Sequence, residues 1–441
     1  MNRLLSSFVA VAAALFANAA INPAVAENVA IVGGKVVTMG SSGTIENGTV
    51  LIEGGRIAAV GSGLSVPAGY RVINAGGNYV TPGLMSALSG LGVTEVGAVA
   101  GTRDNGVNGG QRSGAVETAP FDAAFELAPA FNPNATNIPI ARIEGVTRAM
   151  LPASSGHNIF GGIGAVVDLS GDMDTRVISG AAMSMSYGEA GARYAGGSRA
   201  AAMGYIVRAL DEADRLVRRG TRSLPDRERD SVVSLIDAQA LGPVVRGEMP
   251  LLVRVSRASD ILQVLKLRER FENLRFVLQG AQEAWMVADQ LAAAKVPVII
   301  NGMDNLPGDF ESIAATLANG GRLANAGVDV IMVAVGGAGG NERLMPQAAG
   351  IAVANGMSWD DAMASITINP ARAFGIGDRF GSLESGKDAD VVVWDGDPLE
   401  LMSAPTAVFI RGEQVELSSR QTRLRDRYME LSGVTPQAYK K

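Results

Sequence analysis

Between residues 28 and 79, short runs of β-branched residues alternate with pairs of glycines. The runs are VAIVGGKVVTM, GTVLIEGGRIAAVG and RVINAGGNYV, and Gly33-Gly34 and Gly54-Gly55 interrupt the first two. β-Branched residues favour strands, and glycine accepts the positive φ that tight hairpin turns require. This pattern predicts a small β-sheet.

Residues 82–378 follow a different pattern, in which an apolar run is followed by a helical one. The runs MPLLVRV, LRFVLQG, VPVIING and VDVIMVAV have the length of buried strands, and an amphipathic segment follows each of them. This alternation is typical of a (β/α)8 barrel, and a doubly wound parallel sheet is the alternative. Residues 86–139 are richer in Gly, Asn and Pro, which predicts long irregular connections above the first strands.

The β-rich pattern returns near the other end of the chain, in FGSLESGKDADVVVWDGDPLE and AVFIRGEQVEL. Two distant segments of the same style predict that both ends of the chain meet in one small β-sandwich, into which the barrel is inserted. We therefore predict a composite β-sandwich of residues 27–81 and 379–418, a barrel of residues 82–378, and a C-terminal helix or tail of residues 419–441.

The predicted C-terminal helix is amphipathic. Its charged side carries Arg423, Arg425, Asp426 and Arg427, and its other side carries Leu424, Tyr428 and Leu431. This spacing predicts that the helix docks on the body of the protein through its apolar side. A subunit contact is the alternative.

The first 26 residues have the order of a secretory signal peptide. Arg3 precedes the apolar run FVAVAAALFA, and Ala24-Val25-Ala26 precedes Glu27, where we predict cleavage. An uncleaved anchor is the alternative, but the apolar run is shorter than the roughly 20 residues of a spanning helix. We therefore expect an exported protein, in the simplest case periplasmic, with no membrane span after cleavage.

The composition narrows the classes of function. The chain of 441 residues is 47% hydrophobic and 19% charged, with a formal net charge of -6, and it contains no cysteine and one histidine. Disulfides and thiolate sites are therefore excluded. The charges are interspersed, without the basic stripe and aromatic residues that a nucleic acid would require, so we predict no nucleic-acid partner.

Several segments together resemble the amidohydrolase superfamily, and in particular its imidazolonepropionase-like branch. They are IEGGRIAAVG, YVTPGL, IARIEGVTRAMLP, SITINPARAFGIGDRFGSLESGKDADVVVWDGDP and RQTRLRDRYMELSG, in the order of the family and over nearly the whole chain after residue 26. The resemblance implies a barrel that carries a β-sandwich built from both ends. It also implies hydrolysis of non-peptide C–N bonds by one or two divalent metals, usually zinc, which activate a water molecule.

The family pattern of metal ligands is missing from this sequence. The His-x-His pair of the first barrel strand falls on Leu88-Ser89-Gly90, and the single histidines of the fifth and sixth strands fall on Arg254 and Gln279. Glycines around Gly337 stand where an aspartate is expected. Leu and Gly side chains donate no electron pair, and a guanidinium has no acceptor. We therefore predict no metal and no metal-dependent catalytic residue.

A few other residues could take part in catalysis or in the binding of an ion, but the sequence supports each of these roles only weakly. His157 is either a loop residue bonded to nearby backbone or a lone general base or substrate contact near the barrel mouth. Asp168, Asp172 and Asp174 are either oxygen ligands for calcium or magnesium or charges of a solvated loop. The run Gly336–Gly340 could hold a phosphate, but it lacks a P-loop ending. No Ser, Thr or Lys has a recognisable base beside it in the sequence.

Polar residues replace the missing ligands. Arg254, Gln279, Asn301 and Asp304 fall at or just beyond predicted strand ends, on the face where barrel enzymes act. This set could bind a carboxylate or an amide without metal, with Arg254 as a bidentate partner. The alternative is that Arg254 and an acidic neighbour such as Asp304 neutralise each other where a cation is absent.

Three hypotheses follow for the function. The first is a non-catalytic subunit that pairs with a homologous, metal-bearing amidohydrolase or with a second copy of itself. The second is a periplasmic binding protein for a small acid or amide. The third is a hydrolase of C–N bonds in cyclic amides, imides or dipeptide-like compounds, with an unorthodox or shared site.

Overall fold

The computed structural model describes residues 27–106, 121–154, 158–173, 175–220, 231–304, 306–334 and 341–429. The predicted signal peptide, His157, Asp174, the glycine run 336–340 and Leu431 lie outside these ranges. In the described part, no helix combines the length and the apolar character of a membrane span.

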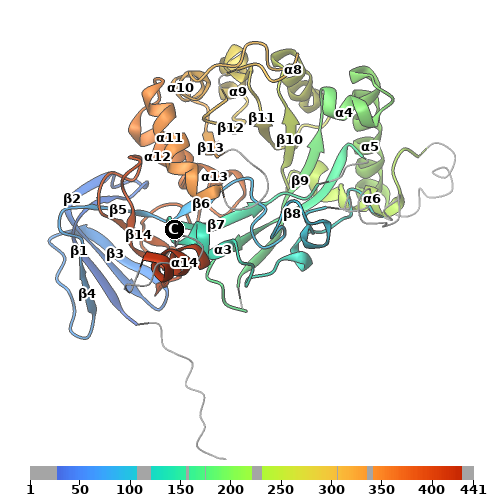
Figure 1. The fold of residues 1–441 in the computed structure, drawn as a ribbon. Coiled ribbons are helices and arrows are strands. Elements are labelled where there is room, and N and C mark those ends of the chain that lie inside the picture. The colour runs from blue at the N-terminus through green and yellow to red at the C-terminus, as the bar shows by residue number, and fades with distance from the viewer. Residues whose placement is uncertain are drawn as a thin grey trace, which may run out of the picture.

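One eight-stranded sheet forms the barrel, and its strands follow each other in chain order (Figure 1). The strands are β6 (Leu84–Ser86), β7 (Val146–Leu151), β8 (Phe160–Asp168), β9 (Val177–Ser186), β10 (Leu251–Val255), β11 (Phe276–Gly280), β12 (Val298–Asn301) and β13 (Val330–Val333). The predicted barrel is confirmed, and the doubly wound alternative is wrong because the strand order never reverses. One feature differs from a (β/α)8 barrel: β8 runs antiparallel to both β7 and β9.

Helices cover the outside of the strands that follow β9 (Figure 1). They are α4 (Glu189–Tyr194), α5 (Arg199–Arg219), α6 (Leu235–Ala240), α7 (Gly242–Val245), α8 (Ala258–Lys266), α9 (Ala288–Ala293), α10 (Asn319–Asn325), α11 (Met345–Ala354), α12 (Trp359–Ser365) and α13 (Ile368–Ala373). The short helix α3 (Ile138–Arg142) precedes β7, and α14 (Arg420–Met429) follows the last strand. The 3₁₀ turns are η1 (Ala100–Thr102), η2 (Ala128–Ala130), η4 (Leu267–Glu269), η5 (Ala284–Val287) and η6 (Glu342–Leu344).

Apolar side chains fill the interior of the barrel. Leu252, Val277, Ile299 and Ile331 belong to one buried cluster, which Phe374 and Phe380 also join. Side chains alternate along a strand, so the residues two positions further on point to the same interior. On β10, β11 and β12 those residues are Arg254, Gln279 and Asn301. The change from apolar to polar marks the carboxyl end of the barrel as the candidate site.

A second eight-stranded sheet joins the two ends of the chain. Its strands are β1 (Val29–Val37), β2 (Thr44–Glu53), β3 (Arg56–Ser62), β4 (Arg71–Asn74), β5 (Tyr79–Pro82), β14 (Val391–Trp394), β15 (Pro405–Ile410) and β16 (Glu413–Gln414). Strand β14 pairs antiparallel with β5, which links the C-terminal strands to the N-terminal ones. The predicted β-rich unit from both termini is therefore confirmed.

Strand β1 changes partners in the middle of this sheet. Its first residues pair with β4, whereas Lys35 and Val36 pair with β5. The change occurs at Gly33-Gly34, where the register with β2 shifts and Gly33 has a φ of 67°. Glycine reaches this left-handed conformation without the steric cost of a Cβ atom. The glycine pair predicted as a hairpin turn is therefore a bend within one strand.

Packing explains the Pro-Gly motif between β5 and β6. A Cβ atom on Gly83 would lie 2.1 Å from the Thr147 hydroxyl oxygen, which is far inside van der Waals contact. The Trp394 indole N–H donates to the Thr81 hydroxyl oxygen at 2.9 Å. The motif thus lets the first barrel strand, β7 and β14 approach one another closely.

A buried ion network holds the barrel on the second sheet. Arg148 on β7 lies 2.7 Å from Asp390, 3.4 Å from Asp388 and 3.8 Å from Asp168. Asp168 is fully buried, and Arg411 also contacts it at 3.4 Å. The interpretation of Asp168 as a charge of a solvated loop is therefore wrong, because its carboxylate contacts the buried Arg148 and the partly buried Arg411. The carboxylates of the GKDAD segment have the same role.

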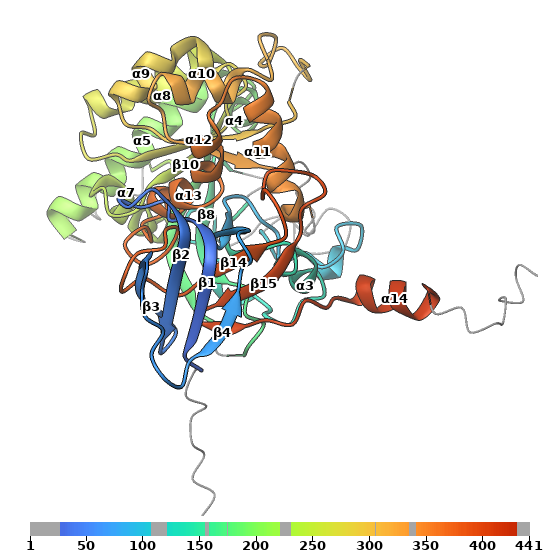
Figure 2. The same cartoon turned by 90° about the vertical axis from the view of Figure 1, so that its left-hand side faces the viewer.

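The C-terminal helix does not dock on the body through its apolar side. Helix α14 has no buried residue, and Leu424 and Tyr428 are 39% and 65% exposed. Figure 2 shows α14 extending away from both sheets. The docking prediction is therefore wrong for the described part of this helix, and its apolar side chains face outward.

Candidate functional site

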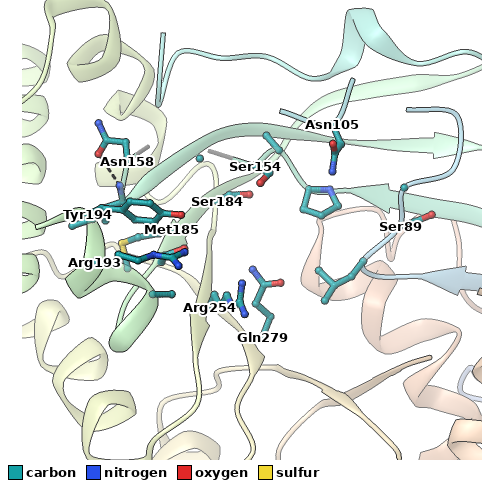
Figure 3. Close-up of a pocket in the computed structure, with 18 residues that line it drawn as sticks. Ser89, Asn105, Ser154, Asn158, Ser184, Met185, Arg193, Tyr194, Arg254 and Gln279 are labelled. Atoms are coloured by element: carbon teal, nitrogen blue, oxygen red, sulfur yellow. Dashed lines mark hydrogen bonds between the residues drawn. The ribbon is translucent and has the colours of Figure 1, made fainter. Parts of the chain in front are cut away.

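A cavity of about 520 Å³ opens at the carboxyl end of the barrel (Figure 3). Strands β9, β10 and β11 contribute Ser184, Arg254 and Gln279, and helix α4 contributes Arg193 and Tyr194. A second cavity of about 390 Å³ shares Leu88, Arg254 and Gln279 with the first. We call them the first and second mouth cavities.

The residues at the family's ligand positions do not fit a divalent metal. Leu88 and Gly90 line the first mouth cavity, beside the guanidinium of Arg254 and the amide of Gln279. A guanidinium repels a cation, and an amide oxygen is a weak ligand for zinc. The described ranges contain no group of three or more His, Cys, Asp or Glu side chains that could hold a metal ion. The position of Gly337 lies outside these ranges.

Arg254 is available to a ligand. The residue is exposed, and its guanidinium has no hydrogen bond or ion pair with any described residue. The Tyr187 backbone N–H donates to the Arg254 carbonyl oxygen at 3.0 Å, which holds the end of β10 in place. Figure 3 shows the side chains of Arg254 and Gln279 side by side, both pointing into the cavity. The structure thus brings these two predicted residues together.

Asn301 and Asp304 form a separate pair on the wall of the second mouth cavity. The Asn301 side-chain amide donates to Asp304 at 2.7 Å, and the Gln282 amide donates to the other carboxylate oxygen at 3.3 Å. No ion pair within 4.0 Å joins Asp304 to Arg254 among the described residues. Asp304 therefore accepts hydrogen bonds from neutral amides rather than from Arg254, and compensation of Arg254 by an acidic neighbour through a longer distance stays a prediction.

His157 lies outside the described residues, so both interpretations of it stay predictions. Its described neighbour Asn158 lines the first mouth cavity and donates to the Asp122 carboxylate at 2.7 Å.

Sequence reasoning missed three side chains that face the first mouth cavity. Arg193 and Tyr194 lie on α4, within the unremarkable segment GEAGARYAGG, and no spacing in the sequence marks them. Ser184 on β9 is 7% exposed, and its hydroxyl has no hydrogen-bond partner among the described residues. Figure 3 shows Arg193, Tyr194 and the Ser184 hydroxyl directed toward the space above Arg254.

Several described serines have a carboxylate beside them, contrary to the sequence-based expectation, and Ser89 is the one of them that lines the first mouth cavity. The Ser89 hydroxyl donates to Glu342 at 2.7 Å, and both residues are 7% exposed. The Leu91 backbone N–H donates to the same hydroxyl at 3.1 Å. In Figure 3, however, the Ser89 hydroxyl points away from Arg254 and Gln279. This geometry ties the segment after β6 to η6 and does not present a nucleophile to the cavity.

The two mouth cavities differ in charge. Arg193 and Arg254 line the first cavity, and no carboxylate is among its described lining residues. The second cavity adds Asp304 and Glu342 to Arg254. The first cavity can therefore stabilise a negative charge, whereas the second is mixed.

Comparisons with known proteins agree with this architecture. Residues 276–417 match the model of the Amidohydrolase family. The chain is 27% identical over 377 residues to amidohydrolase tasK of Hapsidospora irregularis, a match that covers 79% of this chain and 37% of that protein. It is 45% identical over 65 residues to an imidazolonepropionase of Erwinia tasmaniensis, covering 13% of this chain and 16% of the relative.

A solved structure extends the likeness to the whole fold. An amidohydrolase from Thermotoga maritima superposes with a TM-score of 0.74 at 25% sequence identity, over 88% of this chain and 99% of that one. By contrast, the matched region spans little more than a third of amidohydrolase tasK and about a sixth of the imidazolonepropionase. Residues 276–417 therefore carry an Amidohydrolase family domain, and the fold of the chain is similar to that of a solved amidohydrolase.

Proposed function

We propose that this chain is an exported, metal-free member of its family that binds a small carboxylate or amide at the barrel mouth without hydrolysing it. The observation that carries this proposal is the Arg254 guanidinium, which has no hydrogen bond or ion pair with a described residue and stands at a position of the family's metal ligands. An exposed cation at that point opposes a divalent metal and attracts an anion.

The chemistry of the cavity suits binding better than hydrolysis. Arginine can hold a carboxylate through two parallel N–H groups, and the amide of Gln279 beside it can donate to the ligand or accept from it. Hydrolysis of an amide without a metal-activated water needs an activated nucleophile and an oriented base. Ser89, the described serine of the first mouth cavity that donates to a carboxylate, points away from Arg254 in Figure 3.

Replacing Arg254 with alanine tests the proposal. We expect isothermal titration calorimetry to detect binding of one or more small carboxylates from a panel that also contains hydantoins and imidazolones. A hydrogen-bonded pair with a charged group contributes about 1.5–3 kcal/mol, so Arg254→Ala should raise Kd by roughly 10- to 150-fold. Arg254→Lys should recover only part of this loss, because an ammonium group lacks the planar fork.

Arg275→Ala is the matched control. Arg275 is an exposed arginine that immediately precedes β11, at the end of the barrel opposite Gln279, and its loss changes the net charge equally. It should leave Kd unchanged. Equal binding by the Arg254→Ala protein, or about one equivalent of tightly held zinc with turnover of a cyclic amide, would overturn the proposal and favour a hydrolase with an unorthodox or shared site.

A second candidate function is a non-catalytic subunit that pairs with a metal-bearing relative or with a second copy. The observation that favours it is the outward apolar side of α14, formed by Leu424 and Tyr428. Because exposed apolar groups gain stability when a partner covers them, this helix is a suitable docking element.

Co-expression with a relative that retains the histidine ligands tests this candidate. We expect the two chains to elute together in size-exclusion chromatography, and Leu424→Asp/Tyr428→Asp to separate them. Arg423→Ala, on the charged side of the same helix, should leave the complex intact. The subunit hypothesis would be ruled out if the unmodified chains eluted separately, if the relative's activity did not change and if this chain did not self-associate.

A further inference from the structure

We infer that the first mouth cavity is built for a small organic dianion, with Arg254 and Arg193 as its two charged contacts. This inference rests on the proposed function, because it names the class of ligand that the same site would take. Dicarboxylates are the simplest members of that class. Three independent features of the cavity support the assignment.

The first feature is a pair of arginines that form no ion pair with a described residue. Arg193 is exposed near the end of α4 and points into the cavity from the side opposite Ser89 (Figure 3). Its guanidinium lies 5.6 Å from the centre of the Tyr194 ring, and it has no hydrogen bond or ion pair with a described residue. Arg254 likewise has none, and no described carboxylate lines this cavity. Two like charges that face one cavity repel each other, and a ligand with two negative charges would neutralise both.

The second feature is the hydroxyl of Ser184. It is buried without a hydrogen-bond partner among the described residues, and Figure 3 shows it on the cavity wall above Arg193 and Arg254. Buried hydroxyls nearly always have a partner, and one that lacks it in the free protein is a candidate contact for a ligand. A carboxylate oxygen would accept this hydrogen bond.

The third feature is the size of the cavity and its apolar wall. A volume of about 520 Å³ falls in the range of roughly 300–1,000 Å³ that is common for small-molecule sites. Leu88, Ile159 and Met185 line it together with the polar groups. These side chains can contact a short carbon skeleton between two carboxylates, whereas inorganic phosphate would leave them without a contact.

Calorimetry with matched ligands tests the inference. The panel is succinate, glutarate and N-acetylglutamate, with butyrate and N-acetylalanine as monoacids and inorganic phosphate as a separate dianion. We expect at least one diacid to bind about 10-fold or more tightly than either monoacid, as a second charge-assisted contact implies. Arg193→Ala should remove this preference and leave monoacid binding unchanged. Arg254→Ala should weaken both classes, and Ser184→Ala should weaken the diacid by about 3- to 10-fold.

The outcomes separate the inference from the proposed function. Equal affinities for monoacids and diacids, with no effect of Arg193→Ala but a loss in Arg254→Ala, would overturn the inference and keep the proposed function. If Arg254→Ala changes the Kd of no ligand, both the inference and the proposed function are overturned. The dicarboxylate assignment would be overturned if inorganic phosphate bound as tightly as the best diacid and if Arg193→Ala weakened phosphate binding to the same extent. Arg275→Ala serves again as the control, and circular dichroism verifies that each variant is folded.

Discussion

Replacing Arg148 with alanine is expected to lower the free energy of unfolding by about 3–5 kcal/mol. The guanidinium is 5% exposed, and it contacts Asp390, Asp388 and Asp168, whose side chains are 1%, 4% and 0% exposed. Removing the cation would leave these carboxylates close together in a low-dielectric interior, and an uncompensated buried charge is costly. Urea unfolding followed by circular dichroism measures this loss.

The pKa of Arg148 shows how strongly the network favours its charged form. Burial alone would lower the pKa of this guanidinium, but the carboxylate of Asp390 and then those of Asp168 and Asp388 outweigh burial and raise it. The arginine therefore stays charged despite its burial, and it links β7 to the segment that leads into β14.

Arg176→Ala is the matched control for this prediction. Arg176 contacts the same Asp388 carboxylate at 3.0 Å, but its side chain is 40% exposed. Exposed ion pairs contribute about 0–1 kcal/mol, so this variant should unfold almost like the unmodified protein. If both arginines prove equally dispensable, the ion network does not hold the two sheets together.

Replacing Phe380 with alanine should also cost about 3–5 kcal/mol of unfolding free energy. Phe380 is 2% exposed and belongs to the cluster that fills the barrel interior. Its ring centre lies 5.4 Å from the Arg148 guanidinium, which adds a cation–π contact. The truncation would leave a cavity inside the barrel and remove that contact, and urea unfolding again measures the change.

Phe310→Ala is the control for the aromatic truncation. Phe310 is 81% exposed, so its loss should change the unfolding free energy by about 0.5 kcal/mol or less. Because Phe380 and Arg148 are in contact, the double variant should lose less stability than the sum of the two single losses. Strict additivity would show that the ring does not support the ion network.

The sequence predicted the elements well because their signals are local. Runs such as LLVRV and FVLQG have the length and apolar character of buried strands, and they form β10 and β11. The antiparallel course of β8 has no such signal, because the direction of a strand depends on the partners it finds in the sheet. The outward position of α14 was missed for a related reason: an amphipathic pattern shows that a helix has an apolar side but not what covers it.

In the candidate site, too, some residues could be predicted from the sequence and others could not. Arg254 and Gln279 could be predicted because alternation along a strand places them above Leu252 and Val277 at the end of the barrel. Arg193 lies on a short helix whose orientation no local pattern encodes. The burial of the Ser184 hydroxyl also depends on neighbouring segments that are distant in the sequence.

By itself, the sequence determined the order of strands and helices, the resemblance to amidohydrolases and the absence of histidines at the family's ligand positions. These properties reside in residue identities and short-range periodicity. Only the tertiary structure decided the partners of each charge: Asp304 is held by amides, Asp168 by Arg148 and Arg411, and Arg254 by no described residue. The physical reason is that Coulomb energy and hydrogen bonding depend on distance and burial, which the chain acquires only when segments hundreds of residues apart pack together.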